Sequence, residues 1–168
     1  PGDPWSTMST VKSLSAMLVG ATLADGFIQR VNDPVCDHLP QLAATAYEGV
    51  TVRHLLTMSS GMAWLEDYTD RTSHVNRYSR LLAAKKPGGV LELLRTVSPA
   101  HRPGTVWSYN TGDTYLLGAV LTAATRTTLA DYMARKIWRP CGMEFDGFYT
   151  LDSEGGQEIA GSRAGMTL

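Results

Sequence analysis

The chain has 168 residues, of which 43% are hydrophobic and 18% charged, and its formal net charge at pH 7 is -1. This composition is typical of a globular protein and excludes an intrinsically disordered chain. The near-neutral charge gives no electrostatic footprint for nucleic acid or an anionic membrane, and the apolar runs are too short to span a bilayer. The length suffices for one domain with its own hydrophobic core.

Helical spacing dominates the start of the chain. Apolar residues recur at intervals of three and four over residues 9–24, and Asp25-Gly26 is typical of a helix end. Asp33, which precedes a proline, predicts the N-cap of a short helix that Pro40 limits. We therefore expect one long helix followed by one short helix.

Two further helices flank an aromatic and acidic loop. Residues 51–61, TVRHLLTMSSG, predict a short helix that Thr51 caps and Gly61 ends. Residues 62–72 predict the loop, and residues 73–86 predict a helix that a Pro-Gly-Gly run breaks.

The second half of the chain predicts more helices and, near its end, two short strands. The expected helices cover residues 90–97, 113–125 and 128–138, with a loop over 99–105. Thr128-x-x-Asp131 is similar to a capping box at the start of the last helix. The Gly-rich tail predicts strands near 148–151 and 158–161. We therefore expect a mainly α chain, cut from a larger mixed fold.

Ser9 and Lys12 lie three residues apart at the start of the first predicted helix, so they share one face of it. A serine in the first turn lies near the positive end of the helix dipole, and its N–H can help to bind an oxyanion. A desolvated lysine one turn further on can take part in proton transfer, which lets the hydroxyl attack a carbonyl. The alternative is that Ser9 caps the helix and Lys12 points to water.

Tyr109 lies in a turn-like segment, PGTVWSYNTGD, just before a predicted buried helix. A tyrosine held near a lysine ammonium can serve as general base and general acid. The alternative is an amphipathic core residue whose hydroxyl reaches the surface.

The remaining reactive side chains indicate no metal site. Cys36 and Cys141 lack metal-ligand spacing, and a disulfide and two separate thiols both stay open. The histidines form no H-E-x-x-H or H-x-H pattern; they are His38, His54, His74 and His101. The chain also lacks the G-x-S-x-G motif of an α/β-hydrolase.

The motifs of this chain, taken in their order along the sequence, resemble those of the penicillin-recognising serine hydrolases. Ser9-Thr10-Val11-Lys12 is similar to the family's S-x-x-K motif, and Tyr109-Asn110-Thr111 stands where its Y-x-N motif would be. Residues 51–61 resemble the family's T-V-R-x-L-L-x-x-x-S-G. Further similar segments are Asp33-Pro34-Val35 with Leu39-Pro40, Leu116-Leu117-Gly118, and Trp138-x-Pro140-x-Gly142-Met143. The resemblance therefore covers nearly the whole chain.

The most similar branch is that of the class C β-lactamase-like enzymes. Within it, residues 24–28, 64–68 and 107–114 are similar to 6-aminohexanoate-dimer hydrolases and related esterases. This resemblance implies that residues 1–168 are part of one domain of the α/β serine β-lactamase/D,D-peptidase-like fold. They would supply its helical domain and nucleophile helix, without most of the antiparallel sheet. Further strands would precede Pro1, and the family's third motif, K-T-G, H-T-G or a variant, would follow Leu168.

The resemblance also implies roles for individual residues. Ser9 would be the nucleophile that forms an acyl-enzyme, Lys12 would assist its deprotonation, and Tyr109 would pass the proton to the leaving group and then help to activate water. No metal or cofactor would be needed. Thr111 would contact substrate, but it replaces the Asn of many members and so lacks their amide donor.

The acidic loop has two interpretations. Glu66, Asp67 and Asp70 cluster near Trp64 and Tyr68, as in a solvated loop. Alternatively, the loop covers the acyl pocket, where Trp64 and Tyr68 would bind substrate and the acidic groups would contact a cationic or polar end.

The resulting expectation is a serine hydrolase that cleaves a linear amide or small ester. The alternatives are a β-lactamase or D,D-peptidase and, in another class, a non-catalytic binding module with the same fold. The expected partner is a small-molecule substrate, and the compartment stays open between the bacterial cytoplasm and periplasm. Without the sheet, the Ser9 helix should expose a large apolar patch, so we expect the isolated 168 residues to be marginally stable or to aggregate.

Overall fold

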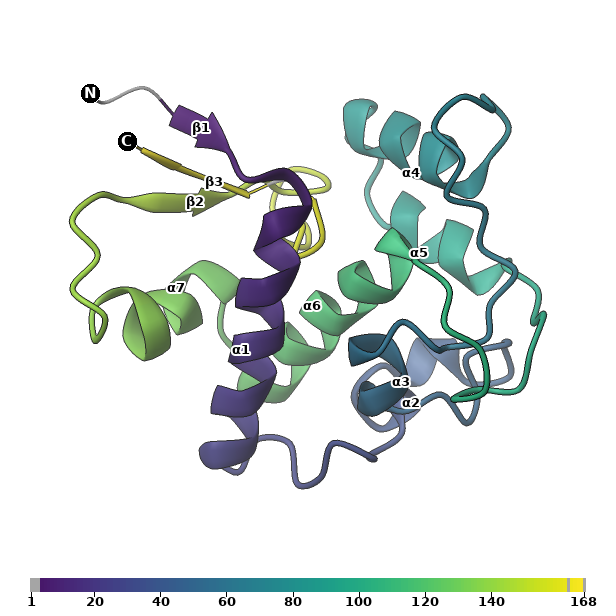
Figure 1. The fold of residues 1–168 in the computed structure, drawn as a ribbon, viewed down its shortest axis with the longest axis horizontal. Coiled ribbons are helices and arrows are strands. Elements are labelled where there is room, and N and C mark those ends of the chain that lie inside the picture. Colours follow the sequence, from purple (N-terminus) through teal and green to yellow (C-terminus); the bar gives the residue numbers. More distant parts are fainter. Residues whose placement is uncertain (1–3, 163, 168) are drawn as a thin grey trace.

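The computed structural model describes residues 4–162 and 164–167. Its helices pack together in one group, and its three strands lie at one side of this group, near both ends of the chain (Figure 1). The helices are α1 (Val11–Ala24), α2 (Val35–His38), α3 (Val52–Leu56), α4 (His74–Ala83), α5 (Gly89–Arg95), α6 (Thr111–Thr125) and α7 (Leu129–Met133). Short 3-10 helices are η1 (Met8–Thr10) and η2 (Pro40–Leu42), and η3 (Ala134–Trp138) is a stretch of π-helix. The strands are β1 (Pro4–Ser6), β2 (Gly147–Tyr149) and β3 (Ala164–Thr167).

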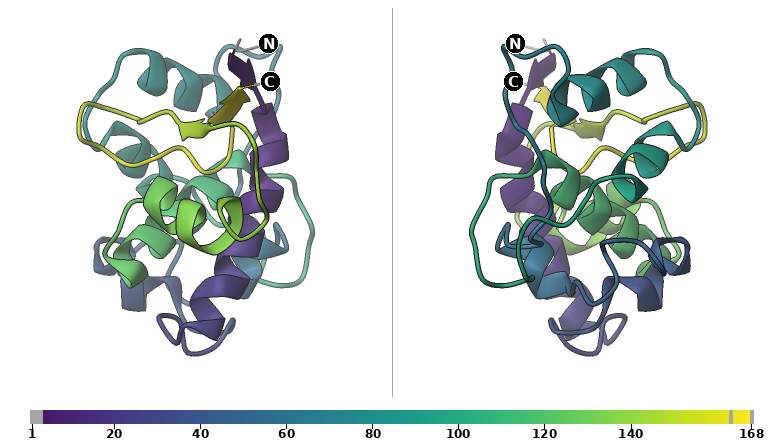
Figure 2. Two further views of the ribbon diagram at one scale, coloured as in Figure 1. Left: turned by 90° about the vertical axis from the view of Figure 1, so that its left-hand side faces the viewer. Right: turned by 90° about the vertical axis from the view of Figure 1, so that its right-hand side faces the viewer.

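α6 is the central helix, and ten of its residues are buried. α1 crosses it on one side and α3 packs on it from another, while α4 and α5 lie beyond its N-terminal end (Figures 1 and 2). Buried residues lie on every side of this helix from Thr111 to Leu121, because neighbouring elements surround that part of it, as they do a core helix. The N-terminal end of α6 therefore lies between α1 and α4, where the predicted site residues are found.

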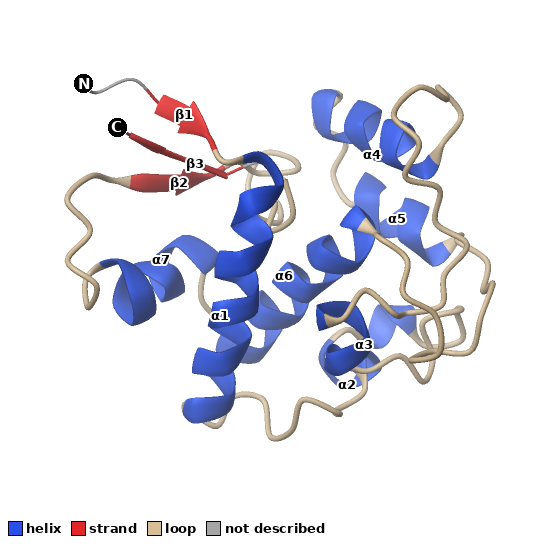
Figure 3. Cartoon of the chain, in the orientation of Figure 1, coloured by secondary structure: helices blue, strands red, loops and turns tan. Residues whose placement is uncertain are grey.

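The three strands form an antiparallel sheet in the order β1-β3-β2 (Figure 3). Trp5 pairs with Met166, and Phe148 pairs with Gly165, so the first described strand lies beside the last. The predicted strand near 148–151 corresponds to β2. β1 and β3 were not predicted, because three or four residues give too little alternation to read.

The predicted strand over 158–161 is wrong. This segment makes only one isolated bridge, between Leu151 and Glu158. Its polar groups are used by helices instead: the Glu158 carboxylate accepts from the N–H groups at the start of α7, the Ala160 carbonyl accepts from Ser15, and the Gly161 carbonyl accepts from Lys12. The hydrogen bonds of this segment therefore go mainly to helices and not to a strand ladder.

Several predicted helix boundaries also need correction. Asp33 is not the N-cap of α2, since its carboxylate accepts from the backbone of Gln29 and Arg30 in the preceding turn. The helix predicted over 51–61 ends at Leu56, and the helix predicted from 113 begins two residues earlier, at Thr111. Thr51, Ser73 and Thr128 each accept a hydrogen bond from the third residue of their helix, as N-cap residues do.

The exposed side of α1 is less apolar than expected. The small residues Ser13, Ala16 and Gly20 are exposed there, and Met17, at 54% exposure, is the large apolar side chain among the exposed residues of that helix. The expectation of a large apolar patch on this helix is therefore wrong. Cys36 and Cys141 are free thiols. Among the described residues, each helix is too short or too polar to cross a bilayer.

Candidate active site

Ser9 lies in a tight turn that leads from β1 into α1. Thr7 anchors this turn, because its N–H and its hydroxyl both donate to the Ala164 carbonyl on β3, each at 3.0 Å. Met8, between them, has a φ of +46°, a left-handed conformation that is costly for a residue with a side chain. Ser9 thus follows a strained residue in η1, at the start of the helix, and its side chain is half-buried.

Lys12 points to Ser9. Its Nζ donates to Ser9 Oγ at 3.0 Å and also to the backbone carbonyl of Gly161. The alternative in which Lys12 points to water is therefore wrong. The Gly161 carbonyl, which sequence reasoning did not identify, fixes the ammonium in place from a segment far along the chain.

Tyr109 completes the predicted group. Lys12 Nζ lies 5.2 Å from the centroid of the Tyr109 ring, within the range of a cation–π interaction. Asn110, next to Tyr109, caps α6 by accepting a hydrogen bond from the Asp113 N–H at 3.1 Å. This cap fixes the backbone beside Tyr109, so the helix start positions its ring against Lys12.

A cavity of about 320 Å³ opens beside Ser9. Its lining comes from the η1 turn, the acidic loop, α4, the start of α6 and the segment before β3. The lining residues are Ser6, Met8, Ser9, Tyr68, Val75, Tyr78, Ser79, Thr111 and Ser162. The structure therefore brings Ser9 to one cavity with Tyr68 and Thr111, two of the side chains that were predicted to contact substrate.

Trp64 lies elsewhere. Its side chain is only 6% exposed. Its ring stacks on the His74 ring, with the ring centroids 5.4 Å apart, and contacts the Tyr78 ring edge to face. It does not line the cavity beside Ser9, although its edge reaches a shallow groove that Tyr109 also lines. Its indole N–H donates to Glu66, so it supports the acidic loop from the core.

Glu66 is the residue in this region that sequence reasoning left undecided. Its carboxylate accepts from the Thr111 N–H at 3.0 Å, the Thr111 hydroxyl at 2.5 Å and the Tyr68 hydroxyl at 2.7 Å, in addition to Trp64. The loop is therefore not simply solvated, because Glu66 attaches it to the N-terminus of α6. The signal in the sequence is the spacing Trp64-x-Glu66-x-Tyr68, which places the donor side chains two residues on either side of the carboxylate.

Burial shifts two pKa values around this site. Partial desolvation of the hydroxyl and its hydrogen bond to the Glu66 carboxylate raise the pKa of Tyr68 to about 12, although most of this side chain is exposed, so the hydroxyl keeps its proton at neutral pH. Burial raises the pKa of Asp113, in the first turn of α6, to about 8. Asp113 therefore favours its neutral form below that pH, while the Asn110 amide donates to its Oδ1 at 3.0 Å.

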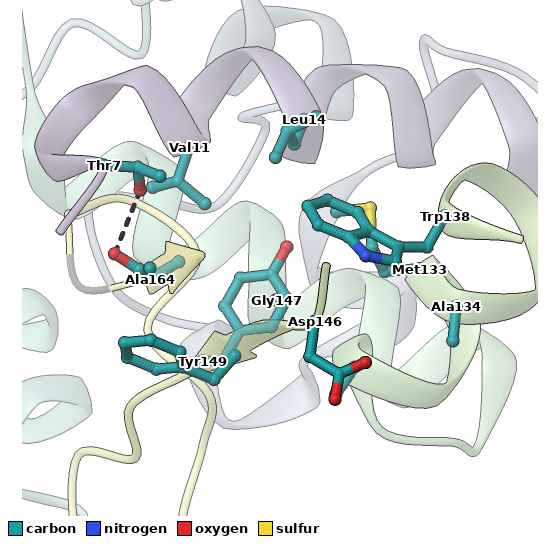
Figure 4. Close-up of a pocket in the computed structure, with 13 residues that line it drawn as sticks. Thr7, Val11, Leu14, Met133, Ala134, Trp138, Asp146, Gly147, Tyr149 and Ala164 are labelled. Carbon is teal, nitrogen blue, oxygen red and sulfur yellow. Dashed lines mark hydrogen bonds between the residues drawn. The ribbon is translucent and has the colours of Figure 1, made fainter. Parts of the chain in front are cut away.

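A second, smaller cavity of about 120 Å³ lies between α1, η3 and the sheet (Figure 4). Figure 4 shows Tyr149 and Trp138 beneath α1, with Val11 and Leu14 above them. Ser9 does not line it, whereas Ser9 lines the larger cavity, which is therefore the candidate site. Over residues 4–162 and 164–167, no group of three or more His, Cys, Asp or Glu side chains could hold a metal ion.

Comparisons with known proteins agree with these observations. The chain is 27% identical, over 160 residues, to the 6-aminohexanoate-dimer hydrolase of Paenarthrobacter ureafaciens, covering 92% of this chain and 40% of that protein. A protein of Bacillus anthracis provisionally named as a 6-aminohexanoate-dimer hydrolase has a similar structure, with a TM-score of 0.83, 20% identity, and coverage of 99% of this chain and 45% of that one. A class C β-lactamase superposes with a TM-score of 0.70 at 17% identity, covering 98% of this chain and 47% of that one.

The chain thus spans less than half the length of these relatives. The two similar structures have the β-lactamase/D,D-peptidase-like fold, and this chain matches 45% and 47% of their lengths. The predicted resemblance to class C β-lactamase-like enzymes and 6-aminohexanoate-dimer hydrolases is confirmed. Because residues 1–165 match the family model described as Beta-lactamase, the chain belongs to the beta-lactamase family.

Proposed function

We propose that this chain carries the nucleophile of a serine hydrolase, which cleaves a linear amide or small ester through an acyl-enzyme on Ser9. The observation that carries the proposal is the hydrogen bond of 3.0 Å from Lys12 Nζ to Ser9 Oγ. A lysine aimed at a half-buried serine hydroxyl can stabilise the oxygen as it loses its proton. The non-catalytic alternative has no use for this arrangement.

The chemistry follows from these positions. Ser9 Oγ attacks the carbonyl carbon while the Lys12 ammonium stabilises the oxygen that is losing its proton; the proton passes to Tyr109, which delivers it to the departing amine or alcohol. The bond to the leaving group breaks, which leaves an acyl group on Ser9. A water molecule then attacks the ester, returns a proton to Ser9 and releases the acid. The Ser9 N–H, at the start of the helix, is positioned to donate to the oxyanion of each tetrahedral intermediate.

The relatives support a hydrolase and favour the linear amide. One relative is named for a 6-aminohexanoate dimer and another as a class C β-lactamase. The first is 27% identical to this chain and the second 17%. The β-lactamase alternative is tested by comparing a chromogenic β-lactam with a chromogenic ester and a linear amide on the full-length gene product; faster β-lactam turnover would replace our substrate class.

The central test is labelling of the full-length gene product with a fluorophosphonate, followed by intact mass and peptide mapping. We expect one adduct, on Ser9, that Ser9→Ala abolishes. Ser13→Ala is the matched control, because Ser13 is an exposed serine one turn further along α1; it should leave the adduct unchanged. A full-length product that stays unlabelled would overturn the hydrolase proposal in favour of a non-catalytic module.

A further inference from the structure

The hydrogen bonds around Glu66 use all of its acceptor sites. Oε2 accepts from the Trp64 indole N–H and the Thr111 backbone N–H, and Oε1 accepts from the hydroxyls of Thr111 and Tyr68. A carboxylate has about four lone-pair positions and no hydrogen to give. Glu66 therefore has no acceptor site left for a ligand, and its effect on the cavity passes through the two hydroxyls.

Each of those hydroxyls has a single hydrogen. Thr111 and Tyr68 both line the cavity beside Ser9, and both give their hydrogen to Glu66. The oxygens keep their lone pairs, which remain able to accept. Partial desolvation and the hydrogen bond to Glu66 also raise the pKa of Tyr68 to about 12, so its hydroxyl stays a donor to Glu66 rather than becoming a phenolate. This part of the wall consequently offers hydrogen-bond acceptors and no hydroxyl donors.

We propose that Glu66 is a specificity-determining residue, which commits the hydroxyl hydrogens of Thr111 and Tyr68 and so selects substrates that present an N–H donor to this wall. The inference rests on the proposed function, since it describes the same cavity. A carbonyl or ether at this point would face lone pairs, whereas an amine or ammonium finds two acceptors. The nearby carboxylate charge favours the ammonium further.

The positive charge of Lys12 does not lie on the wall formed by Thr111 and Tyr68, where the ammonium group of a substrate would bind. Its ammonium is occupied by Ser9 Oγ and the Gly161 carbonyl, and it does not line the cavity. The positive charge therefore acts on the reacting oxygen, while the acceptors lie on the wall formed by the loop and α6.

The test compares three small probes of similar length on the full-length gene product. n-Butylammonium has charge and N–H donors, butyltrimethylammonium has charge without donors, and 2-pentanone has only an acceptor. Saturation-transfer NMR measures their binding without any need for a reactive serine, and slowing of fluorophosphonate labelling at Ser9 locates the binding at this cavity. We expect n-butylammonium to bind about tenfold more tightly than either other probe.

Glu66→Gln supplies the decisive variant. The Gln amide oxygen would accept from Trp64 and the Thr111 N–H, and its NH₂ would then face the two hydroxyls and turn their hydrogens into the cavity. The preference should therefore shift from the ammonium to the ketone. Asp70→Asn is the matched control, because it removes the same charge from the same loop. Among the described contacts, the Asp70 carboxylate accepts hydrogen bonds only from the N–H and hydroxyl of Thr72. It should keep the ammonium preference.

Tyr68→Phe repeats the test without disturbing the core, because Tyr68 is 65% exposed; it should weaken n-butylammonium binding several-fold and leave 2-pentanone unchanged. Equal binding of ammonium and ketone by the native protein, or an unchanged preference in both Glu66→Gln and Tyr68→Phe, would overturn the inference. If NMR shows the preference while Ser9 stays unlabelled, the proposed hydrolysis fails and the donor selection stands.

Discussion

Lys12 donates a hydrogen bond to the carbonyl oxygen of Gly161, a residue 149 positions further along the chain. The same ammonium reaches Ser9 Oγ at 3.0 Å. The start of α1 is therefore held to the segment just before β3, and this contact aims the lysine at the serine. Its geometry suits a lysine, whose ammonium carries three hydrogens on one atom.

Lys12→Met should lower the rate of fluorophosphonate labelling at Ser9 by roughly 10²–10⁴-fold, because proton transfer by a positioned group contributes about that much. Lys12→Arg should restore little, since the planar guanidinium directs its hydrogens differently. Lys86→Met is the control, as Lys86 is an exposed residue paired with Glu92. Labelling kinetics on the full-length product measure all three, and a Lys12→Met variant that reacts at the native rate would contradict the assigned role.

Gly61→Ala should destabilise the fold more than Gly26→Ala. Both glycines have left-handed φ values, +80° and +77°, which cost an alanine about 1–2 kcal/mol. A Cβ on Gly61 would also lie 2.2 Å from the carbonyl oxygen of His101, whereas a Cβ on Gly26 meets nothing within 4 Å. We expect Gly61→Ala to lose roughly a further 1–3 kcal/mol. Urea unfolding of the two variants gives the comparison, and equal midpoints would show that the loop around His101 moves aside freely.

Asp113 should make the protein less stable as pH rises. Burial raises its pKa in the folded state to about 8, from an ordinary value of 3.8. Between these values the folded state holds a proton that the unfolded chain has released, so stability falls with increasing pH, by up to about 1.4 kcal/mol per unit, and levels off above pH 8. Asp113→Asn keeps the Oδ1 acceptor for Asn110 and should flatten this slope. Urea midpoints at pH 5, 6, 7 and 8 measure it; parallel curves for both proteins would contradict the assignment.

His74 should have the opposite effect at lower pH. Its Nδ1 accepts the Leu65 N–H at 3.0 Å, which requires the neutral ring, and burial and then Arg77 lower its pKa below the ordinary 6.5. The unfolded chain therefore binds a proton before the folded state does, so this stabilisation is complete above about pH 6.5 and is lost on acidification. His74→Gln should reduce the acid sensitivity, while His101→Gln, at an exposed position, should not. Thermal melts from pH 5 to 7 distinguish them.

Much of the local structure could be predicted from short stretches of sequence. Thr51, Ser73 and Thr128 all act as N-caps, because the capping bond joins residues only three apart and depends on little else. The predictions were poorer where a neighbouring turn competes for the same polar group. Asp is a common N-cap residue and Asp33 precedes a short helix, yet its carboxylate accepts hydrogen bonds from the backbone N–H groups of Gln29 and Arg30 in the preceding turn.

The sequence by itself determined which residues could carry the chemistry, since Ser9 and Lys12 are one helical turn apart and Tyr109 precedes a buried helix. Only the tertiary structure decided how they meet: Gly161 directs Lys12, and Glu66 joins the acidic loop to Thr111. It also separated Tyr68, which lines the cavity, from Trp64, which lies in the core. The reason is physical. A helix turn follows from neighbouring residues, but a hydrogen bond across 149 positions forms only when packing of the whole core has brought the two segments together.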